Sequence, residues 1–121
     1  MKDLFDQTSD AVAQMVTRKY STSFSMAVKL LAPKIRRHIY NIYGFVRLAD
    51  EIVDSFHEYD KAKLLNQFEA DYYRAMEDGI SLNPVLNAFQ FTVKTCNIED
   101  HLVDAFLKSM RRDLIQSDYD S

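Results

Sequence analysis

Apolar residues recur every three to four positions along most of this 121-residue chain, which is the spacing of one face of an α-helix. The pattern predicts six helices, over residues 9–19, from Ser21–Ser23 to just before Pro33, and over residues 34–57, 60–77, 85–96 and 97–117. An alternation of apolar and polar residues, as in a half-buried β-strand, is nowhere sustained. The sequence therefore predicts an all-α fold, a helical bundle.

Few residues in the chain interrupt helices. There are two glycines and two prolines, and Gly79 follows the helix predicted over residues 60–77, where it is suited to cap the C-terminus. The length fits one domain, and no internal repeat, low-complexity tract or interdomain linker is evident.

The helix predicted over residues 34–57 carries two aspartates among apolar neighbours. Asp50 and Asp54 lie one turn apart, and at about 100° per residue they share one sector of the helix with four apolar residues. These are Ile39, Tyr43, Val46 and Val53. The opposite side is apolar as well, which predicts a helix that is buried nearly all round.

Three penalties act on this aspartate pair. An unpaired buried carboxylate is strongly disfavoured, like charges four residues apart repel by about 0.2–0.5 kcal/mol, and anions near a helix C-terminus cost about 0.3–1 kcal/mol. A Mg²⁺ ion would relieve all three, because it binds one or two carboxylates together with water and phosphate. Arg47, one turn before Asp50, can neutralise part of the charge and offer a bidentate donor to phosphate. From this segment alone, a solvated helix face with Arg47 in a surface ion pair with Asp50 or Glu51 is the alternative.

Hydroxyl groups precede this helix in the segment YSTSF. Ser21 and Ser23, at or just before a predicted helix start, can present hydroxyl and backbone N–H groups to an anion. Serine is also a common N-cap, so the segment is weak evidence when taken alone.

Taken together, residues 20–54, YSTSFSMAVKLLAPKIRRHIYNIYGFVRLADEIVD, resemble the N-terminal region of the squalene and phytoene synthase family. The family pattern runs from Ser-x-Ser-Phe through a leucine pair, a proline, an arginine and a tyrosine to a second arginine followed by DxxxD, the first aspartate-rich motif. The matching positions are Ser21, Ser23, Phe24, Leu30, Leu31, Pro33, Tyr43, Arg47, Asp50 and Asp54. The later segment MRRDLIQSDY resembles the family segment that precedes its central active-site helices, so the resemblance extends from about residue 9 to the end.

The resemblance implies an isoprenoid synthase fold and a prenyltransferase activity. The reaction would be the head-to-head condensation of two prenyl diphosphates through a cyclopropylcarbinyl diphosphate, as in phytoene, squalene or dehydrosqualene synthases of isoprenoid and carotenoid biosynthesis. Asp50 and Asp54 would hold Mg²⁺ against the diphosphate, and Arg47, Ser21 and Ser23 would bind its oxygens.

Two aromatic residues complete the site that the resemblance implies. Tyr43 and Phe24 would line the prenyl cavity, where aromatic faces stabilise passing carbocations, and Tyr43 would belong to the catalytic group. Whether the substrate has 15 or 20 carbons, which product forms, and whether a reductive step with NADPH follows are left open by the sequence.

The chain departs from the family in lacking its second DxxxD motif, which faces the first from a later helix. Asp100 and Asp104 form a literal DxxxD but lack the surrounding pattern, and we interpret them as a solvated helix face. Residues 1–121 are therefore expected to be the N-terminal helical portion of a synthase-like domain, a fragment that is inactive alone. Without the rest of that domain, the apolar stripe formed by Ile39, Tyr43, Val46 and Val53 would be exposed, which predicts self-association.

Composition excludes several other classes of function. The net charge of −3 and pI near 5.5 argue against a nucleic-acid partner. Cys96 is the one cysteine and cannot form an internal disulfide, the N-terminus does not resemble a signal peptide, and no apolar run approaches the roughly 18 residues of a membrane span. The sequence therefore favours a cytoplasmic protein, with peripheral membrane contact left open.

Two alternative functions remain. A non-catalytic helical assembly or binding module derived from the same fold would also lack the second motif. A carboxylate-bridged di-metal bundle is suggested by Asp54 and His57, which are spaced like the acid and histidine of such sites, but no second acid-x-x-His exists because neither His38 nor His101 has an acid three residues before it.

Overall fold

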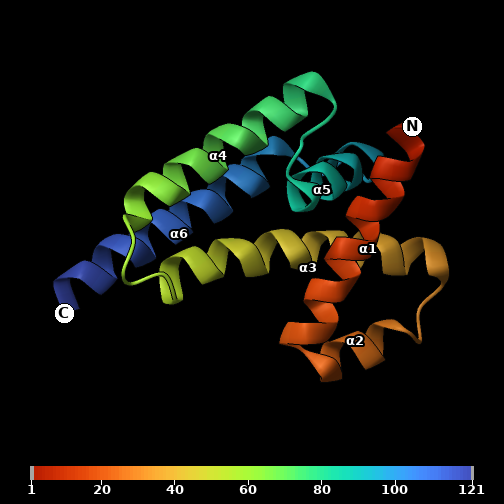
Figure 1. The fold of residues 1–121 in the computed structure, drawn as a ribbon, viewed down its shortest axis with the longest axis horizontal. Helices are drawn as coiled ribbons and strands as arrows, with labels where there is room; N and C mark the ends of the chain where they lie inside the picture. Colours follow the sequence, from red (N-terminus) through yellow and green to blue (C-terminus); the bar gives the residue numbers. More distant parts are fainter. Residues whose placement is uncertain (1, 121) are drawn as a thin grey trace.

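Six α-helices make up the chain in the computed structural model, which describes the backbone of residues 2–120 and the side chains of residues 2–116. The helices are α1 (Lys2–Tyr20), α2 (Thr22–Val28), α3 (Pro33–Asp54), α4 (Lys61–Asp78), α5 (Pro84–Thr95) and α6 (Asp100–Asp120). Residues 2–120 contain no strand, so the all-α prediction is confirmed (Figure 1).

Capping residues set several of the helix boundaries. Asp60 accepts a hydrogen bond from the Lys63 N–H at the start of α4, and Asn83 accepts from two N–H groups at the start of α5. Gly79 ends α4 in the left-handed region, with φ of 74°, as its predicted capping role requires.

The start of α1 differs from the prediction. A start at residue 9 assumes that Thr8 or Ser9 caps the helix, whereas the helix begins at Lys2 and both residues lie inside it. Their hydroxyls instead donate back to the carbonyls of Leu4 and Phe5, at 2.8 and 3.0 Å, from within the helix. Serine and threonine can satisfy their hydroxyls in this way inside a helix, so their presence did not mark its end.

The longest helix, α3, lies at the centre of the bundle. It packs against α1, α5, α4 and α6, and Figure 1 shows α1 crossing it while α4 and α6 run side by side. Phe45 of α3 is 1% exposed and stacks on Phe89 of α5, with ring centroids 3.9 Å apart. Phe68 of α4 also stacks on Phe45, with ring centroids 5.2 Å apart. This aromatic group holds α3, α4 and α5 together through apolar burial and ring packing.

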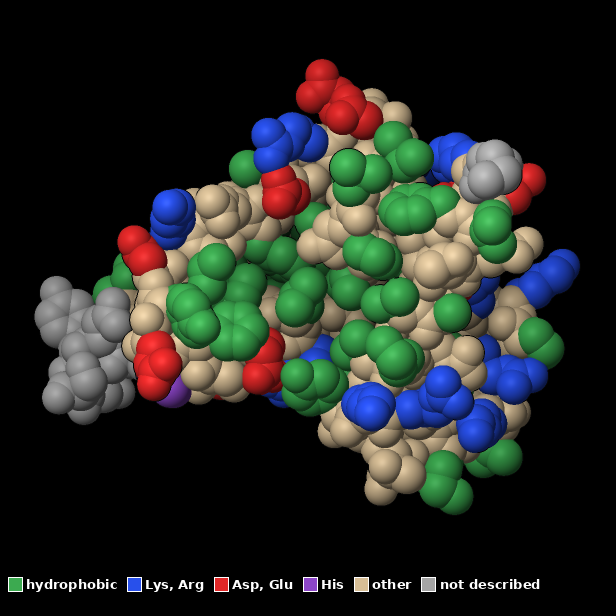
Figure 2. Space-filling view, viewed as in Figure 1, with side chains coloured by type: hydrophobic (Ala, Val, Ile, Leu, Met, Phe, Trp, Pro, Cys, Tyr) green, Lys and Arg blue, Asp and Glu red, His purple; other side chains and the backbone are tan. Residues whose placement is uncertain are grey.

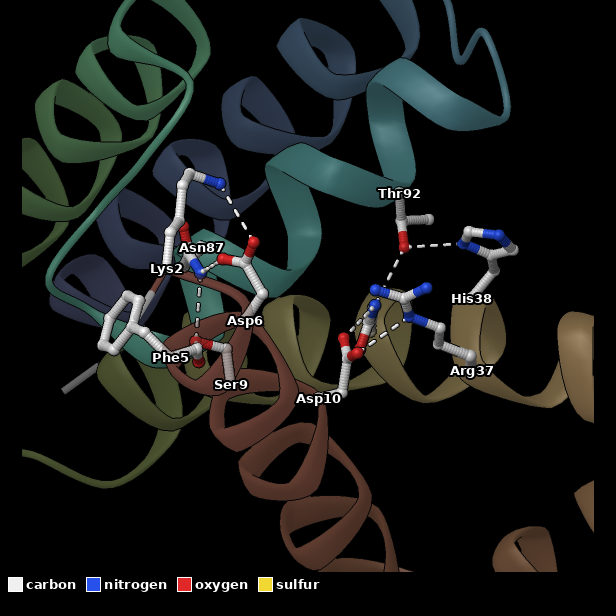
Figure 3. A network of polar contacts seen from close by, with 10 residues as sticks. Lys2, Phe5, Asp6, Ser9, Asp10, Arg37, His38, Asn87 and Thr92 are labelled. Carbon is white, nitrogen blue, oxygen red and sulfur yellow. Dashed lines mark hydrogen bonds and ion pairs between the residues drawn. The ribbon is translucent and has the colours of Figure 1, made fainter.

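A second set of contacts between α1, α3 and α5 is polar and buried. Asn87 of α5 donates to Asp6 at 2.8 Å and to Ser9 at 3.1 Å, both on α1 (Figure 3). Asn41 of α3 donates to Asp10 at 3.1 Å and to Thr92 at 3.0 Å. These bonds fix the register of the three helices, because a shift of any one would leave buried amides without partners.

No helix within residues 2–120 combines the length and the apolar character that crossing a membrane requires.

Candidate functional site

The C-terminal end of α3 carries both predicted aspartates but exposes them unequally. Asp50 lies one turn before the end and is half-buried, whereas Asp54 is the last helical residue and is exposed. The prediction of a helix over residues 34–57 that is buried nearly all round is therefore wrong at this end. The helix stops at Asp54, and the Ser55 N–H donates to the Glu51 carbonyl at the C-cap.

Asp50 occupies an electrostatically strained position. Burial raises the pKa of the Asp50 carboxyl above its ordinary value of 3.8, Arg47 partly offsets the rise, and the negative charges of Asp54 and Asp113 add to it. Asp113 comes from α6, which brings a third carboxylate toward the pair. Sequence reasoning did not assign Asp113 a role, although it lies in the segment MRRDLIQSDY that resembles the family.

Arg47 pairs directly with Glu51 rather than with Asp50 or Asp54. Its guanidinium lies 3.1 Å from the Glu51 carboxylate and 5.0 Å from the ring centroid of Tyr20. Interaction with Ser55 holds the pKa of Glu51 below its ordinary value, and Arg47 adds to this effect. The arginine therefore lowers the charge near Asp50 without pairing with it directly, and its Nε is buried without a hydrogen-bond partner within the described side chains.

The short helix α2 brings a predicted aromatic pair together. Phe24 of α2 stacks on Tyr43 of α3, with ring centroids 5.2 Å apart. Ser21 caps α2 by accepting a hydrogen bond from the Phe24 N–H at 3.2 Å, and Ser23 is exposed in its first turn. Ser21 thus serves as the N-cap that the sequence allowed, and no hydrogen bond among the described residues joins either serine to the aspartates.

An apolar cavity of about 180 Å³ opens beside α3. Its lining residues come from α3, α5, α6 and the turn before α6, and they are Ile42, Phe45, Val46, Phe89, Ile98, Leu102, Val103 and Phe106. Hydrophobic side chains gather over the α3 and α6 region in the space-filling view (Figure 2). Val46 is the one member of the predicted apolar stripe that lines this cavity.

The rest of that stripe is divided between different surroundings. Val53 is 6% exposed and belongs to the main core, so the prediction that it loses its cover is wrong. Ile39 packs against a second core cluster formed by Val28, Tyr40 and others. Tyr43 stays half-buried against α2.

The literal DxxxD of α6 is not the simple solvated face that its sequence suggested. Asp100 is exposed, but Asp104 accepts a hydrogen bond from the Tyr73 hydroxyl of α4. This bond raises the pKa of Tyr73 above its ordinary value. Asp104 therefore connects α4 to α6.

Among the described residues, histidine, cysteine and acidic side chains form no group of three or more that could hold a metal ion. His57 lies beyond the end of α3, so it does not share a helix face with Asp54 as the di-metal alternative requires. The arrangement offers two carboxylates on one helix, with further ligands to come from water or an anion.

Comparison with known proteins gives a matching family and a similar solved structure. A family model described as squalene/phytoene synthase matches residues 17–121. Among solved structures, the crystal structure of squalene synthase HpnC from Alicyclobacillus acidocaldarius is similar, with a TM-score of 0.75 and 28% sequence identity. That match covers 89% of this chain but 40% of the squalene synthase chain, so this chain spans less than half the length of that relative. The comparison with curated proteins gives no match.

Proposed function

This chain belongs to the squalene/phytoene synthase family, and from that premise we propose that the α2–α3 face takes part in the Mg²⁺-dependent head-to-head condensation of two prenyl diphosphates. The observation that carries the proposal is the pair Asp50 and Asp54 beside Asp113, where burial and like charges raise the pKa of Asp50. A position that disfavours its own carboxylate is explained when a cation and a diphosphate complete it.

The residues present fit a Mg²⁺ ion. Carboxylate oxygens are the hard ligands that Mg²⁺ prefers, and one or two of them suffice when water and phosphate supply the other positions. Asp50 and Asp54 would hold the ion, which when bound would supply positive charge to neutralise a leaving diphosphate.

Arg47 and the serines would act on the diphosphate itself. Arg47 is already ordered by Glu51 and Tyr20, so its guanidinium would meet phosphate oxygens with little further loss of conformational freedom. Ser21 and Ser23, at the start of α2, would donate hydroxyl hydrogen bonds to the same group.

The aromatic pair and the apolar cavity would receive the prenyl chain. Phe24 and Tyr43 present ring faces that stabilise an allylic cation and exclude water from it. The cavity beside Val46 offers an apolar wall along the same helix.

We propose further that this chain alone does not complete the reaction. The described residues supply one acidic pair on α3, and in the other DxxxD Asp104 accepts a hydrogen bond from Tyr73. A diphosphate-bearing substrate would need further carboxylates to bind its metal ions from the opposite side. Incubation of the purified chain with C15 and C20 prenyl diphosphates and Mg²⁺ is therefore expected to give no C30 or C40 hydrocarbon, and detection of either would refute this part of the proposal.

Thermal unfolding tests the binding half of the proposal. A ligand that binds only the folded state raises the melting temperature by an amount that grows with the ratio of its concentration to its dissociation constant, so Mg²⁺ with a C15 or C20 prenyl thiodiphosphate is expected to raise it more than either component alone. Asp50→Asn combined with Asp54→Asn should abolish the increment. The matched control, Asp100→Asn with Asp104→Asn, alters the other DxxxD and should keep it. An increment that survives in the first variant, or that never occurs, would contradict the proposed site and favour a non-catalytic binding module.

A further inference from the structure

A polar groove lies between α1 and the first turns of α3, away from the aspartates. Its volume is about 370 Å³. Its polar lining comprises Gln7, Asp10 and Gln14 of α1 and Arg36, Arg37 and Tyr40 of α3. Tyr40 precedes Asp50 by almost three helical turns, about 15 Å along the helix axis. The groove is thus separate from the candidate site.

Two buried donors at this groove have no acceptor within the described part of the chain. Tyr40 is 5% exposed, and its hydroxyl is buried without a hydrogen-bond partner. The Nε of Arg36 is buried and unpaired in the same way. Native proteins rarely leave buried donors unsatisfied, so such a pair on one helix calls for an acceptor.

The carboxylate in the groove is already used. Asp10 lies 2.8 Å from Nε of Arg37 and accepts a hydrogen bond from Asn41 at 3.1 Å (Figure 3). The Nε–H of Arg37 is not aligned for a hydrogen bond in this ion pair. Arg36 forms no ion pair with any described acidic residue, which leaves a net positive charge in the groove.

The surrounding chain segment reinforces that charge. Residues 11–49 contain seven of the fifteen Lys and Arg residues and none of the eighteen acidic residues, although the whole chain has a net charge of −3. The N-terminus of α3, a helix of 22 residues with Pro33 at its start, also directs the positive end of its dipole toward this region. Both effects favour an anion over a neutral ligand.

We infer that this groove binds a phosphate or diphosphate group through the Arg36 guanidinium and the Tyr40 hydroxyl. Arg36 and Tyr40 lie one turn apart on α3, so the oxygens of one phosphate group would accept from both, and a guanidinium matches their geometry. Arg37, held by Asp10, contributes charge and shape at the edge of the site. This inference is independent of the proposed condensation, because it requires neither Mg²⁺ nor the aspartates.

Calorimetric titration of the chain with inorganic diphosphate, in EDTA to remove divalent cations, tests the site. We expect binding that Arg36→Gln weakens at least tenfold and Tyr40→Phe weakens several-fold. Arg74→Gln, an exposed arginine on α4, is the charge-matched control and should change the affinity less than twofold. Asp50→Asn with Asp54→Asn should also retain binding, which separates this site from the proposed one. Dimethylallyl diphosphate should bind as well as the inorganic anion, since the groove would contact only the phosphates.

Amide NMR shifts of the unaltered chain provide a measurement that does not depend on variants folding. Diphosphate should shift residues 7–14 and 34–40 before any others. Absence of binding at millimolar diphosphate, equal weakening by Arg74→Gln, binding of dimethylallyl diphosphate alone, or shifts confined to residues 47–54 would each overturn the inference.

Discussion

The carboxylate of Asp50 is needed for the proposed function but lowers the stability of the fold. Its pKa is raised by burial and by neighbouring carboxylates, which means that ionisation of this group at neutral pH costs folding free energy. It also lies one turn before the C-terminal end of α3, where the helix dipole disfavours an anion.

Asp50→Asn is therefore expected to stabilise the ligand-free fold. The gain should be on the order of 0.5–1.5 kcal/mol at neutral pH, from removal of like-charge repulsion and of an anion near the helix C-terminus. Urea unfolding of the two proteins measures it, with Asp3→Asn, an exposed first-turn residue of α1, as the control. A loss of stability in Asp50→Asn would show that the carboxylate is a structural group.

Asn87 provides the opposite case, in which a buried polar residue stabilises the fold. It is 1% exposed and donates to Asp6 and Ser9 of α1. Asn87→Ala removes a hydrogen-bond donor from both groups, although Asp6 keeps its ion pair with Lys2, and should cost about 1–3 kcal/mol in urea unfolding at pH 7. Gln67→Ala, on the exposed face of α4, should cost far less, and equal losses in both variants would contradict the buried-network account.

The hydrogen bond between Asn87 and Asp6 also makes the stability of the fold depend on pH in a defined direction. The hydrogen bond from Asn87, helped by Lys2, lowers the pKa of Asp6 below its ordinary value of 3.8. An acid with a lowered folded-state pKa contributes its stability in full above its ordinary pKa and loses it as the pH falls through the folded-state pKa. The difference in stability between the natural chain and Asn87→Ala should therefore narrow from pH 5 to pH 3. A difference that widens over this range would be inconsistent with an ionised Asp6 as the partner.

At the level of the helices, α1 and α3 approach each other closely where Gly44 faces Ala13. A Cβ at Gly44 would lie 3.5 Å from the backbone and side chain of Ala13, which is ordinary contact. Gly44→Ala should thus be neutral or stabilise α3 by up to about 1 kcal/mol through helix propensity, whereas Gly44→Leu should separate the helices and destabilise the protein by about 1–3 kcal/mol.

Gly79 is the matched comparison for that substitution. Its φ of 74° lies in the left-handed region, so Gly79→Ala should destabilise the fold by roughly 1 kcal/mol, although an added Cβ would meet only Nζ of Lys94, at an ordinary contact distance of 3.7 Å. Thermal unfolding of both alanine variants distinguishes helix propensity from backbone strain. A clear loss of stability in Gly44→Ala, or a gain in Gly79→Ala, would contradict the corresponding expectation.

Helix periodicity predicted the existence and type of all six elements, but not every boundary. Thr8 and Ser9 are residue types that often cap helices, but their hydroxyls donate to backbone carbonyls inside α1, and which of the two occurs depends on backbone geometry rather than on residue type. Sequence reasoning can propose site residues that lie close together in the sequence, such as Arg47 and Asp50 on α3. It does not indicate Asp113, because Asp113 approaches Asp50 only through the packing of α6 beside α3.

The whole molecule exposes apolar surface next to its cavity. Leu102 of α6 is 55% exposed and lines the cavity beside Val46, and such contiguous apolar surface favours association. Light scattering should show the mass of the chain rising with concentration, and Leu102→Ser should reduce the effect more than Leu82→Ser, a 90% exposed leucine that lies outside this cavity. A constant monomer mass at high concentration would refute the expected self-association.

The most direct test of the central claim is the carbon NMR signal of the aspartate carboxyl groups. On addition of Mg²⁺ together with a prenyl thiodiphosphate, the carboxyl carbons of Asp50 and Asp54 should both shift, and those of Asp100 and Asp104 should not. Neither component alone should produce the full change, since ion and diphosphate complete each other's coordination. Carboxyl signals of Asp50 and Asp54 that stay unchanged at saturating concentrations of both would contradict their proposed role as metal ligands.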